Sequence, residues 1–249
     1  MPGELLIEAG DLSAGYDGET VISNVSFSLG AGERMALLGP NGGGKTTLMR
    51  ALLGELSPLA GTLRVRSRCA GVPQTERSRL DYPVSALDVA AMGALSRLPW
   101  WRPPGRRERE FALKALEQVG LVEQAEETFG KLSGGQRQRV LIARSLVQDA
   151  RVLLLDEPFS GLDRPSAELL EELIASIAAE GRGVLIATHD LEQARRWDSV
   201  LCLNRTQVAC GRPEAVLDLG VIEETYGGSV VELPGGEGRA VLPPHHHEH

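Results

Sequence analysis

The strongest chemical signal in the sequence is a glycine-rich stretch that ends in a lysine and two threonines. Residues 39–46 read Gly-Pro-Asn-Gly-Gly-Gly-Lys-Thr and fit the pattern G-x-x-x-x-G-K-[ST]. Glycines let the backbone turn its N–H groups toward a polyphosphate, and a following helix adds positive potential. Lys45 could reach the β- and γ-phosphates, and the hydroxyl of Thr46 could complete the coordination of Mg2+. The predicted nucleotide site consists of Gly39, Pro40, Asn41, Gly42, Gly43, Gly44, Lys45, Thr46 and Thr47.

Two adjacent carboxylates stand at the end of an unbroken apolar run. Asp156 closes the run that begins at Val152, and Glu157 follows directly. At the carboxyl end of a buried strand, an acidic side chain is well placed to hold phosphate-bound Mg2+. The second carboxylate could orient or deprotonate an attacking water. Such pairs also occur at ordinary strand ends, but the phosphate site in the same chain favours the chemical interpretation.

The hydrophobic pattern indicates the elements that must position these groups. Short alternating segments fill the first 30 residues, and the run 35–38 suits a strand buried on both faces. Helix spacing follows at 46–53 and, after several prolines, at 106–119. From residue 151 onward the α/β alternation resumes. The pattern also predicts strands at 25–29, 153–155 and 184–187, a helix around 169–177, and a hairpin formed by 199–203 and 206–209.

A second motif, Leu-Ser-Gly-Gly-Gln at 132–136, distinguishes among the families that share a glycine-rich phosphate loop. Ser133 alone predicts an N-capped helix after a glycine turn, because serine is a good N-cap residue. The motif resembles the signature of ATP-binding cassette (ABC) proteins. In that family this site contacts the γ-phosphate held by a partner subunit. The resemblance extends this role to Ser133, Gly134, Gly135 and Gln136.

Further residues match the family's markers in the expected order. Tyr16 resembles the aromatic residue that stacks on adenine, and Gln74 resembles the Q-loop glutamine, which senses Mg2+ and the permease. Asp163 lies in a stretch similar to the D-loop, and His189 resembles the switch histidine. Each residue alone would more often be structural, but together they support a resemblance that covers about residues 5–230.

The resemblance implies an α/β fold, a P-loop NTPase cassette of the ABC type. Its RecA-like parallel-sheet core would carry an N-terminal antiparallel β subdomain. An α-helical subdomain, at about residues 75–145, would be inserted in this core. The ATPase domain would occupy residues 1–232, and residues 233–249 would form a flexible, His-rich tail.

The family also implies a mechanism. Two copies of the chain would pair head to tail and enclose two ATP molecules, each between one phosphate loop and the other copy's signature. The expected catalytic residues are Lys45, Glu157 and His189. The expected ligands of the Mg2+ that accompanies ATP are Thr46, Gln74 and Asp156. Hydrolysis would power a separate integral membrane permease, which an extracytoplasmic metal-binding protein would serve.

Composition narrows the class of protein. The chain has 249 residues and a net charge of −8, which argues against a general duplex-DNA binder, so no nucleic-acid partner is expected. No apolar run approaches the roughly 18 residues of a membrane span, and no secretory signal is visible. Three cysteines without a CxxC pair favour free thiols in a reducing compartment. We therefore expect a cytoplasmic protein, peripheral on the cytoplasmic face of the cell membrane.

Weaker similarities concern the substrate. Phe159 stands where many cassettes carry threonine, and the stretches 203–205, 209–217 and 225–228 resemble the zinc/manganese/iron uptake branch. Trp100 and Trp101, just before a basic stretch, resemble that branch too; alternatively they pack on the lobe surface or contact the permease. Transport of an iron chelate or another small substrate, by import or export, remains open. A soluble ATPase of iron–sulfur assembly or DNA repair is a further alternative.

Four of the five histidines lie within the last five residues, 245–249. Imidazole clusters bind zinc, copper or nickel, so this tail could bind or sense the transported metal. A solvated tail without a role and an appended sequence are the alternatives.

Overall fold

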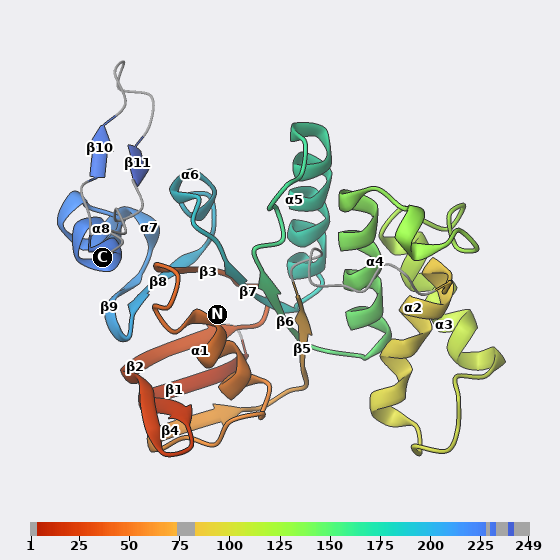
Figure 1. Ribbon diagram of the computed structural model, residues 1–249, viewed down its shortest axis with the longest axis horizontal. Helices are drawn as coiled ribbons and strands as arrows, with labels where there is room; N and C mark the ends of the chain where they lie inside the picture. The colour runs from red at the N-terminus through yellow and green to blue at the C-terminus, as the bar shows by residue number, and fades with distance from the viewer. Residues whose placement is uncertain (1–3, 74–82, 228–229, 233–238, 242–249) are drawn as a thin grey trace, which may run out of the picture. The chain divides into compact units, whose positions relative to one another are not determined.

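The computed structural model describes residues 4–73, 83–227, 230–232 and 239–241 (Figure 1). The chain divides into two compact units, one drawn from residues 1–66 and 185–249 and the other from residues 67–184. The strand β7 (Gly183–Ala187) contains the boundary between them. The predictions for Gln74 and for the histidines at 245–249 fall outside the described residues.

The first unit is built on a mixed sheet whose strands follow the order β4-β1-β2-β9-β8-β3. β1 pairs antiparallel with β2 and with β4, whereas β3 pairs parallel with β8. The antiparallel N-terminal strands and the parallel pair agree with the expected cassette architecture. The elements of this unit are β1 (Leu5–Tyr16), β2 (Glu19–Gly30), β3 (Arg34–Leu38), α1 (Lys45–Leu52), β4 (Ala60–Val65), α6 (Leu191–Ala194), β8 (Ser199–Asn204), β9 (Thr206–Gly211), α7 (Pro213–Val216), α8 (Leu219–Tyr226), β10 (Val230–Glu232) and β11 (Arg239–Val241).

The first two strands are longer than the sequence pattern predicts. β1 and β2 are each 12 residues long, so the prediction of short segments before residue 30 is wrong. The register shifts between Ala9 and Leu12, around Asp11 with its φ of 48°, and the strand continues beyond this irregularity. A bulge of this kind interrupts the alternation of side chains without ending the strand. The predicted strand at 25–29, with every second side chain in the core, is confirmed, because Val25, Phe27 and Leu29 are all buried.

The strand that leads to the glycine-rich loop is fully buried, as predicted. Residues 35–38 of β3 are at most 1% exposed. They run parallel to β8, with Met35 opposite Ser199 and Leu38 opposite Cys202. After β8 the chain turns back, and β9 pairs antiparallel with β8, which confirms the predicted hairpin.

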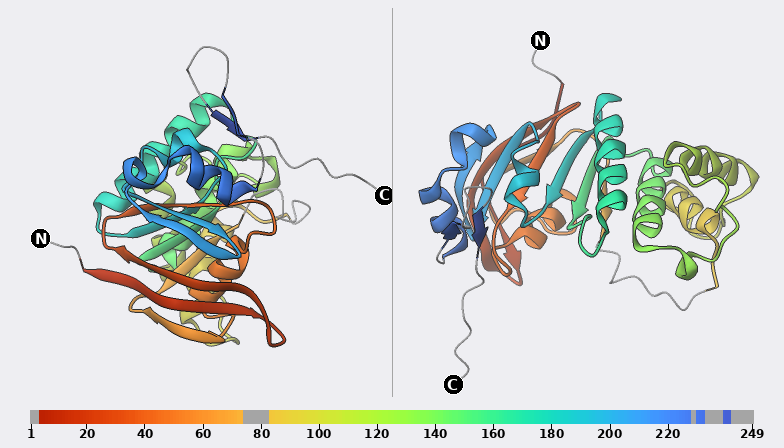
Figure 2. Two further views of the ribbon diagram at one scale, coloured as in Figure 1. Left: turned by 90° about the vertical axis from the view of Figure 1, so that its left-hand side faces the viewer. Right: turned by 90° about the horizontal axis from the view of Figure 1, so that it is seen from above.

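The second unit combines a parallel strand pair with helices (Figure 2). The predicted strand at 153–155 is the buried part of β6, and the predicted helices at 106–119 and 169–177 correspond to α3 and α5. α2, α3 and α4 contact one another, and α4 also contacts α5. In the part of the chain that the structure describes, no helix has the length and apolar character needed to cross a membrane. The elements of this unit are β5 (Cys69–Val72), α2 (Ala86–Ala91), η2 (Met92–Arg97), α3 (Arg106–Gln118), η3 (Phe129–Lys131), α4 (Gly134–Val147), β6 (Val152–Asp156) and α5 (Arg164–Ala179).

Burial along α4 leads to a stability prediction. Ile142 is 0% exposed, whereas Leu169 on α5 is 51% exposed. Ile142→Ala leaves a cavity in the core, and we expect it to lower the free energy of unfolding by about 2–5 kcal/mol. Leu169→Ala should change it by less than about 0.5 kcal/mol, because the side chain is already in water. Urea unfolding of both variants tests this, and equal losses would contradict the described packing.

Candidate functional site

The glycine-rich loop connects the end of β3 to the start of α1. Gly44 is the N-cap residue of α1 and has a φ of 98°, a left-handed conformation that glycine adopts without strain. A Cβ atom at this position would lie 2.2 Å from Cγ2 of Ile22 in β2. The amide of Arg205, in the turn between β8 and β9, donates to the carbonyl of Gly43 at 2.8 Å. The loop is therefore held from two sides, and glycine is required at position 44.

The N-terminus of α1 is left without a side-chain cap. Its N-cap residue, Gly44, makes no side-chain cap hydrogen bond, and its first turn contains no acidic residue. By contrast, α8 in the same unit is capped by Asp218, whose Oδ1 accepts from the amide of Val221 at 2.9 Å. The first amides of a helix have no acceptor within the helix, and the helix dipole makes this end positive. The start of α1 therefore offers backbone donors to an anion such as a phosphate.

Lys45, the first residue of α1, lies under the loop. Its side chain is buried, and Nζ donates to the carbonyl oxygens of Gly39 at 2.6 Å and of Pro40 at 3.1 Å. These bonds offset part of the cost of burying the ammonium group. A phosphate oxygen would be a stronger, charge-assisted partner for the same group. Thr46 is exposed, and its hydroxyl oxygen is the type of ligand that Mg2+ accepts, so these residues fit an ATP-bound Mg2+.

Tyr16 lies at the end of β1, next to α1 in the first unit. Nη1 of Arg50 donates to its hydroxyl at 3.4 Å, and the guanidinium carbon lies over the ring, 5.7 Å from its centroid. This distance fits a cation–π contact. Arg50 could not be predicted from the sequence, because a contact between a strand end and a helix 34 residues later has no local signal.

His189 is exposed in the turn between β7 and α6. The amide of its neighbour Thr188 donates to the carbonyl of Leu37 in β3 at 3.2 Å. On the other side, Oδ1 of Asp190 accepts from the amides of Glu192 at 2.9 Å and Gln193 at 3.1 Å and so caps α6. The phosphate loop begins at Gly39, two residues after Leu37. The structure therefore brings the predicted histidine and the predicted phosphate loop to the same edge of the sheet.

The two candidate carboxylates lie in the second unit, at the end of β6. Asp156 is the last residue of the strand, and both it and Glu157 are partly exposed. Glu157 has a φ of 45°, and the amide of Ser160 donates to its carbonyl at 3.1 Å. A non-glycine residue in this conformation costs about 1 kcal/mol or more. Such strain occurs preferentially at active sites, and here it fixes the direction in which the chain leaves β6.

The signature residues form the start of α4. Oγ of Ser133 accepts from the amide of Gln136 at 3.2 Å, and Oε1 of Gln136 accepts from the amide of Ser133 at 2.9 Å. This reciprocal capping box confirms the predicted N-capped helix. A hydroxyl that accepts one hydrogen bond can still donate another, so the cap does not prevent Ser133 from contacting an anion.

Asp163 performs the same capping role for α5. Its Oδ1 accepts from the amide of Ser166 at 3.1 Å, and hydrogen bonds from the side chain and the amide of Ser166 hold the pKa of the Asp163 carboxyl below its ordinary value. Ser166 also faces α4, since a Cβ atom on Gly135 would lie 2.9 Å from the Cβ of Ser166. The structure therefore brings the predicted signature and D-loop residues together. Ser166 was not predicted, although Asp163 is a favourable N-cap residue type, which indicates a bond to a backbone amide two or three residues later.

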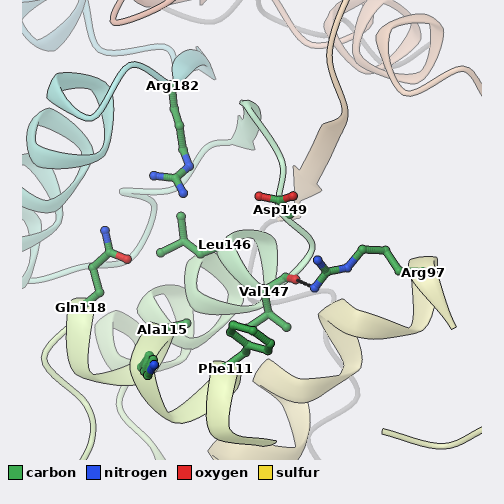
Figure 3. A pocket seen from close by; sticks show the side chains of 9 residues that line it. Arg97, Phe111, Ala115, Gln118, Leu146, Val147, Asp149 and Arg182 are labelled. Carbon is green, nitrogen blue, oxygen red and sulfur yellow. Dashed lines mark hydrogen bonds between the residues drawn. The ribbon is translucent and has the colours of Figure 1, made fainter. Parts of the chain in front are cut away.

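The second unit also contains a pocket of about 390 Å³ that includes none of the predicted site residues (Figure 3). Two of its arginines bond to backbone carbonyls at or after the end of α4: Arg97 donates to the carbonyl of Val147, the last residue of α4, and Nε of Arg182 donates to that of Ala150, three residues later, at 3.3 Å. The bond from Arg97 is of the kind by which a cation stabilises the negative end of a helix. These arginines therefore have a structural role. The pocket is lined by Arg97, Phe111, Lys114, Ala115, Gln118, Leu146, Val147, Asp149 and Arg182.

Comparisons with known proteins agree with this geometry. Residues 22–160 match the family described as ABC transporter. The manganese transport system ATP-binding protein MntB of Halalkalibacterium halodurans is 35% identical over 90% of this chain and 93% of its own length. The zinc transport system ATP-binding protein TroB of Treponema pallidum is 35% identical over 90% of this chain and 88% of its own length.

A solved structure extends the comparison to the fold. An ABC transporter of the metal-chelate type, solved in an inward-facing conformation, is 27% identical to this chain with a TM-score of 0.83. The match covers 98% of this chain and 99% of that one.

The contact between α4 and α5 leads to a prediction at two adjacent glycines. Gly135→Ala places a methyl group 2.9 Å from the Cβ of Ser166, so the start of α5 must shift, and we expect the free energy of unfolding to fall by about 1–3 kcal/mol. At Gly134 the nearest atom would be Cδ2 of Leu162 at 3.6 Å, an ordinary contact. Gly134→Ala should therefore be neutral or stabilising, by up to about 1 kcal/mol. Thermal and urea unfolding measure both, and the same loss in both variants would contradict the proposed packing.

Proposed function

Because the chain belongs to the ABC transporter family, we propose that it is the ATP-hydrolysing subunit of a transporter that moves a divalent metal ion, of the manganese or zinc type, through a separate permease. The family itself establishes the coarser statement: the chain is an ABC ATPase that binds ATP, and such subunits work with membrane permeases. The observation that carries the metal proposal is similarity over 90% of the chain to ATP-binding proteins of manganese and zinc transport systems. This similarity favours metal transport over an iron chelate, another substrate or a soluble assembly ATPase.

In the proposed complex, ATP is held by its phosphates at the start of α1. The uncapped first amides of α1 and the buried ammonium of Lys45 support this assignment, since both can bond to phosphate oxygens. Tyr16 would stack on the adenine, and its contact with Arg50 would help to orient the ring. The remaining phosphate-loop residues would contribute backbone donors and the glycine conformations that the loop requires.

Mg2+ would accompany ATP, with Thr46, Gln74 and Asp156 as its proposed ligands. When bound, Mg2+ neutralises part of the charge on the β- and γ-phosphates. The fit is supported by the exposed hydroxyl of Thr46 and by the partly exposed carboxylate of Asp156. Gln74 enters the set only through the family motif, because it lies outside the described residues.

Glu157 is proposed to orient and activate the attacking water. Its carboxylate can accept a proton from the water while the oxygen attacks the γ-phosphorus in line with the leaving β-phosphate oxygen. Lys45 would offset the negative charge that accumulates on the phosphate oxygens, and His189 would contact the γ-phosphate or the water. The strained backbone at Glu157 supports this role, because a fixed carboxylate need not reorganise during the reaction.

A second copy of the chain is proposed to complete each site. Ser133 can donate its hydroxyl hydrogen, and the first amides of α4 point out of the helix, so the start of α4 is suited to an anion bound by another copy. Asp163 would lie at the contact between the copies. ATP would then close the dimer and hydrolysis would open it. The subunit would dock on the cytoplasmic face of the membrane, and an extracytoplasmic metal-binding protein would deliver the ion to the permease.

Replacing the proposed base tests the mechanism. In Glu157→Gln the side chain can still bond to water but cannot take its proton, so ATP binding should persist while turnover falls by about 100-fold or more. The stalled variant should elute as a dimer in the presence of ATP and Mg2+. Glu172→Gln, an exposed site on α5, should behave like the unmodified protein. Undiminished hydrolysis in Glu157→Gln would remove Glu157 from the mechanism.

The transport proposal requires a separate test. We expect the chain to co-purify in detergent with a polytopic membrane protein and, after reconstitution in vesicles with ATP, to support accumulation of Mn2+ or Zn2+. The measurement is metal uptake with Mn2+, Zn2+, Fe2+ and a ferric chelate compared side by side. Lys45→Ala, which removes the phosphate-binding ammonium, should abolish uptake of every ion. Selective uptake of the chelate would overturn the metal proposal, and co-purification with soluble proteins alone would overturn the transport proposal.

A further inference from the structure

The connection between η2 and α3 presents two tryptophans to solvent. Trp100 is 92% exposed and Trp101 is 70% exposed, although tryptophan is usually largely buried. Their rings contact each other edge to face, with centroids 5.8 Å apart. The two rings thus form a pair at the surface, in contact with each other and largely in solvent. Two adjacent exposed indoles indicate a surface that binds something else.

The backbone holds both rings at the tip of a turn. The amide of Arg102 donates to the carbonyl of Pro99 at 2.9 Å, which makes the two tryptophans the central residues of a β-turn. After the turn, Pro103 and Pro104 restrict the backbone dihedral angles of the chain. The amide of Gly105 then donates to Oε2 of Glu108 at 2.7 Å, and this bond fixes the start of α3. The tryptophans are therefore presented on a short, braced segment between two helical elements.

Arginines flank this turn in the sequence. Residues 97–109, which we call the Trp–Arg loop, contain five arginines and one glutamate, in a chain whose net charge is −8. Some of this charge is paired, since Arg102, Arg106 and Arg109 form ion pairs with Glu108, Glu110 and Asp88. Arg107 instead lies over the ring of Phe111, with its guanidinium carbon 5.6 Å from the centroid. Even with these pairs counted, the loop keeps an excess of positive charge.

We propose that the Trp–Arg loop inserts into the headgroup region of an anionic phospholipid bilayer. Indole rings prefer the membrane–water interface, where the apolar ring and the polar N–H are both satisfied. Arginine beside them attracts anionic headgroups, and its stem can lie along the lipid while its charge stays in the polar layer. Since the chain as a whole is acidic, an anionic membrane would repel its other faces and select this loop. The contact is independent of ATP hydrolysis and of the metal that is transported.

Vesicle binding by the purified full-length chain tests the proposal. We expect sedimentation with vesicles of phosphatidylcholine mixed with phosphatidylglycerol, weak sedimentation with phosphatidylcholine alone, and loss of binding as salt rises. The chain has three tryptophans, and the third, Trp197, is only 4% exposed. The anionic vesicles should therefore shift the tryptophan emission to shorter wavelength through Trp100 and Trp101. In the Trp100→Phe/Trp101→Phe variant, this shift should disappear.

Matched variants separate the loop from other exposed groups. Trp100→Ser/Trp101→Ser and Arg106→Gln/Arg107→Gln should each weaken binding to the anionic vesicles by about tenfold or more. Leu169→Ser is the apolar control, and Arg164→Gln is the charge control, because Arg164 forms the same kind of exposed i,i+4 pair as Arg106. Neither control should change the affinity. The tryptophan variant should keep the ATPase rate of the isolated chain, which shows that it is folded.

Three results would overturn the proposal. One is equal binding to neutral and anionic vesicles, and another is equal loss of binding in the controls. The third combines two observations: the unmodified chain does not bind vesicles, and a loop variant no longer co-purifies with the detergent-solubilised permease. This result would assign the loop to a protein partner. None of these outcomes affects the proposed metal transport, whose test is uptake.

Discussion

The site depends on one physical constraint: the first backbone amides of a helix must bond to something. In the first unit, α1 follows the N-cap residue Gly44, which provides no side-chain cap, so the start of this helix can offer backbone donors to an external anion. In the second unit, α4 and α5 follow the N-cap residues Ser133 and Asp163, whose side-chain oxygens cap them. The two kinds of helix start suit two different roles. An uncapped start binds phosphate through the backbone, whereas a serine-capped start keeps its shape and can still donate a hydroxyl hydrogen.

Close packing then determines where these helix starts lie. Gly44 passes so close to Ile22 that no side chain fits, and Gly135 does the same against Ser166. The turn between β8 and β9 bonds to the phosphate loop through Arg205, and β3 bonds to the backbone beside His189 through Leu37. The phosphate loop, the backbone beside His189 and the start of α4 are therefore each held by an element distant in sequence. Precise placement of this kind lowers the cost of reorganisation during phosphoryl transfer.

The arginines show two different uses of the same side chain. Arg97 bonds to the carbonyl of Val147 at the end of α4, where the helix dipole favours a cation, and Arg182 bonds to the carbonyl of Ala150 in the segment that follows. Arg106 and Arg107 instead remain at the surface, a few residues after two exposed tryptophans in the sequence. In a chain of net charge −8, this second group makes a local positive surface beside apolar rings. The composition of the whole chain thus gives no indication of what this face can bind.

The sequence by itself determined the identity and order of the chemical groups and most of the elements that carry them. Burial on both faces of a strand, helix periodicity and glycine-lysine spacing are local patterns, so β3, α1, β6 and the start of α4 were all predicted. Only the tertiary structure decided the rest. It joined the N-terminal segments into two long strands through bulges, placed Arg50 on Tyr16 and Ser166 against Gly135, and left Trp100 in solvent. The reason is physical: these features depend on contacts between residues far apart in the chain, and a local pattern records which side chains are apolar but not what covers them.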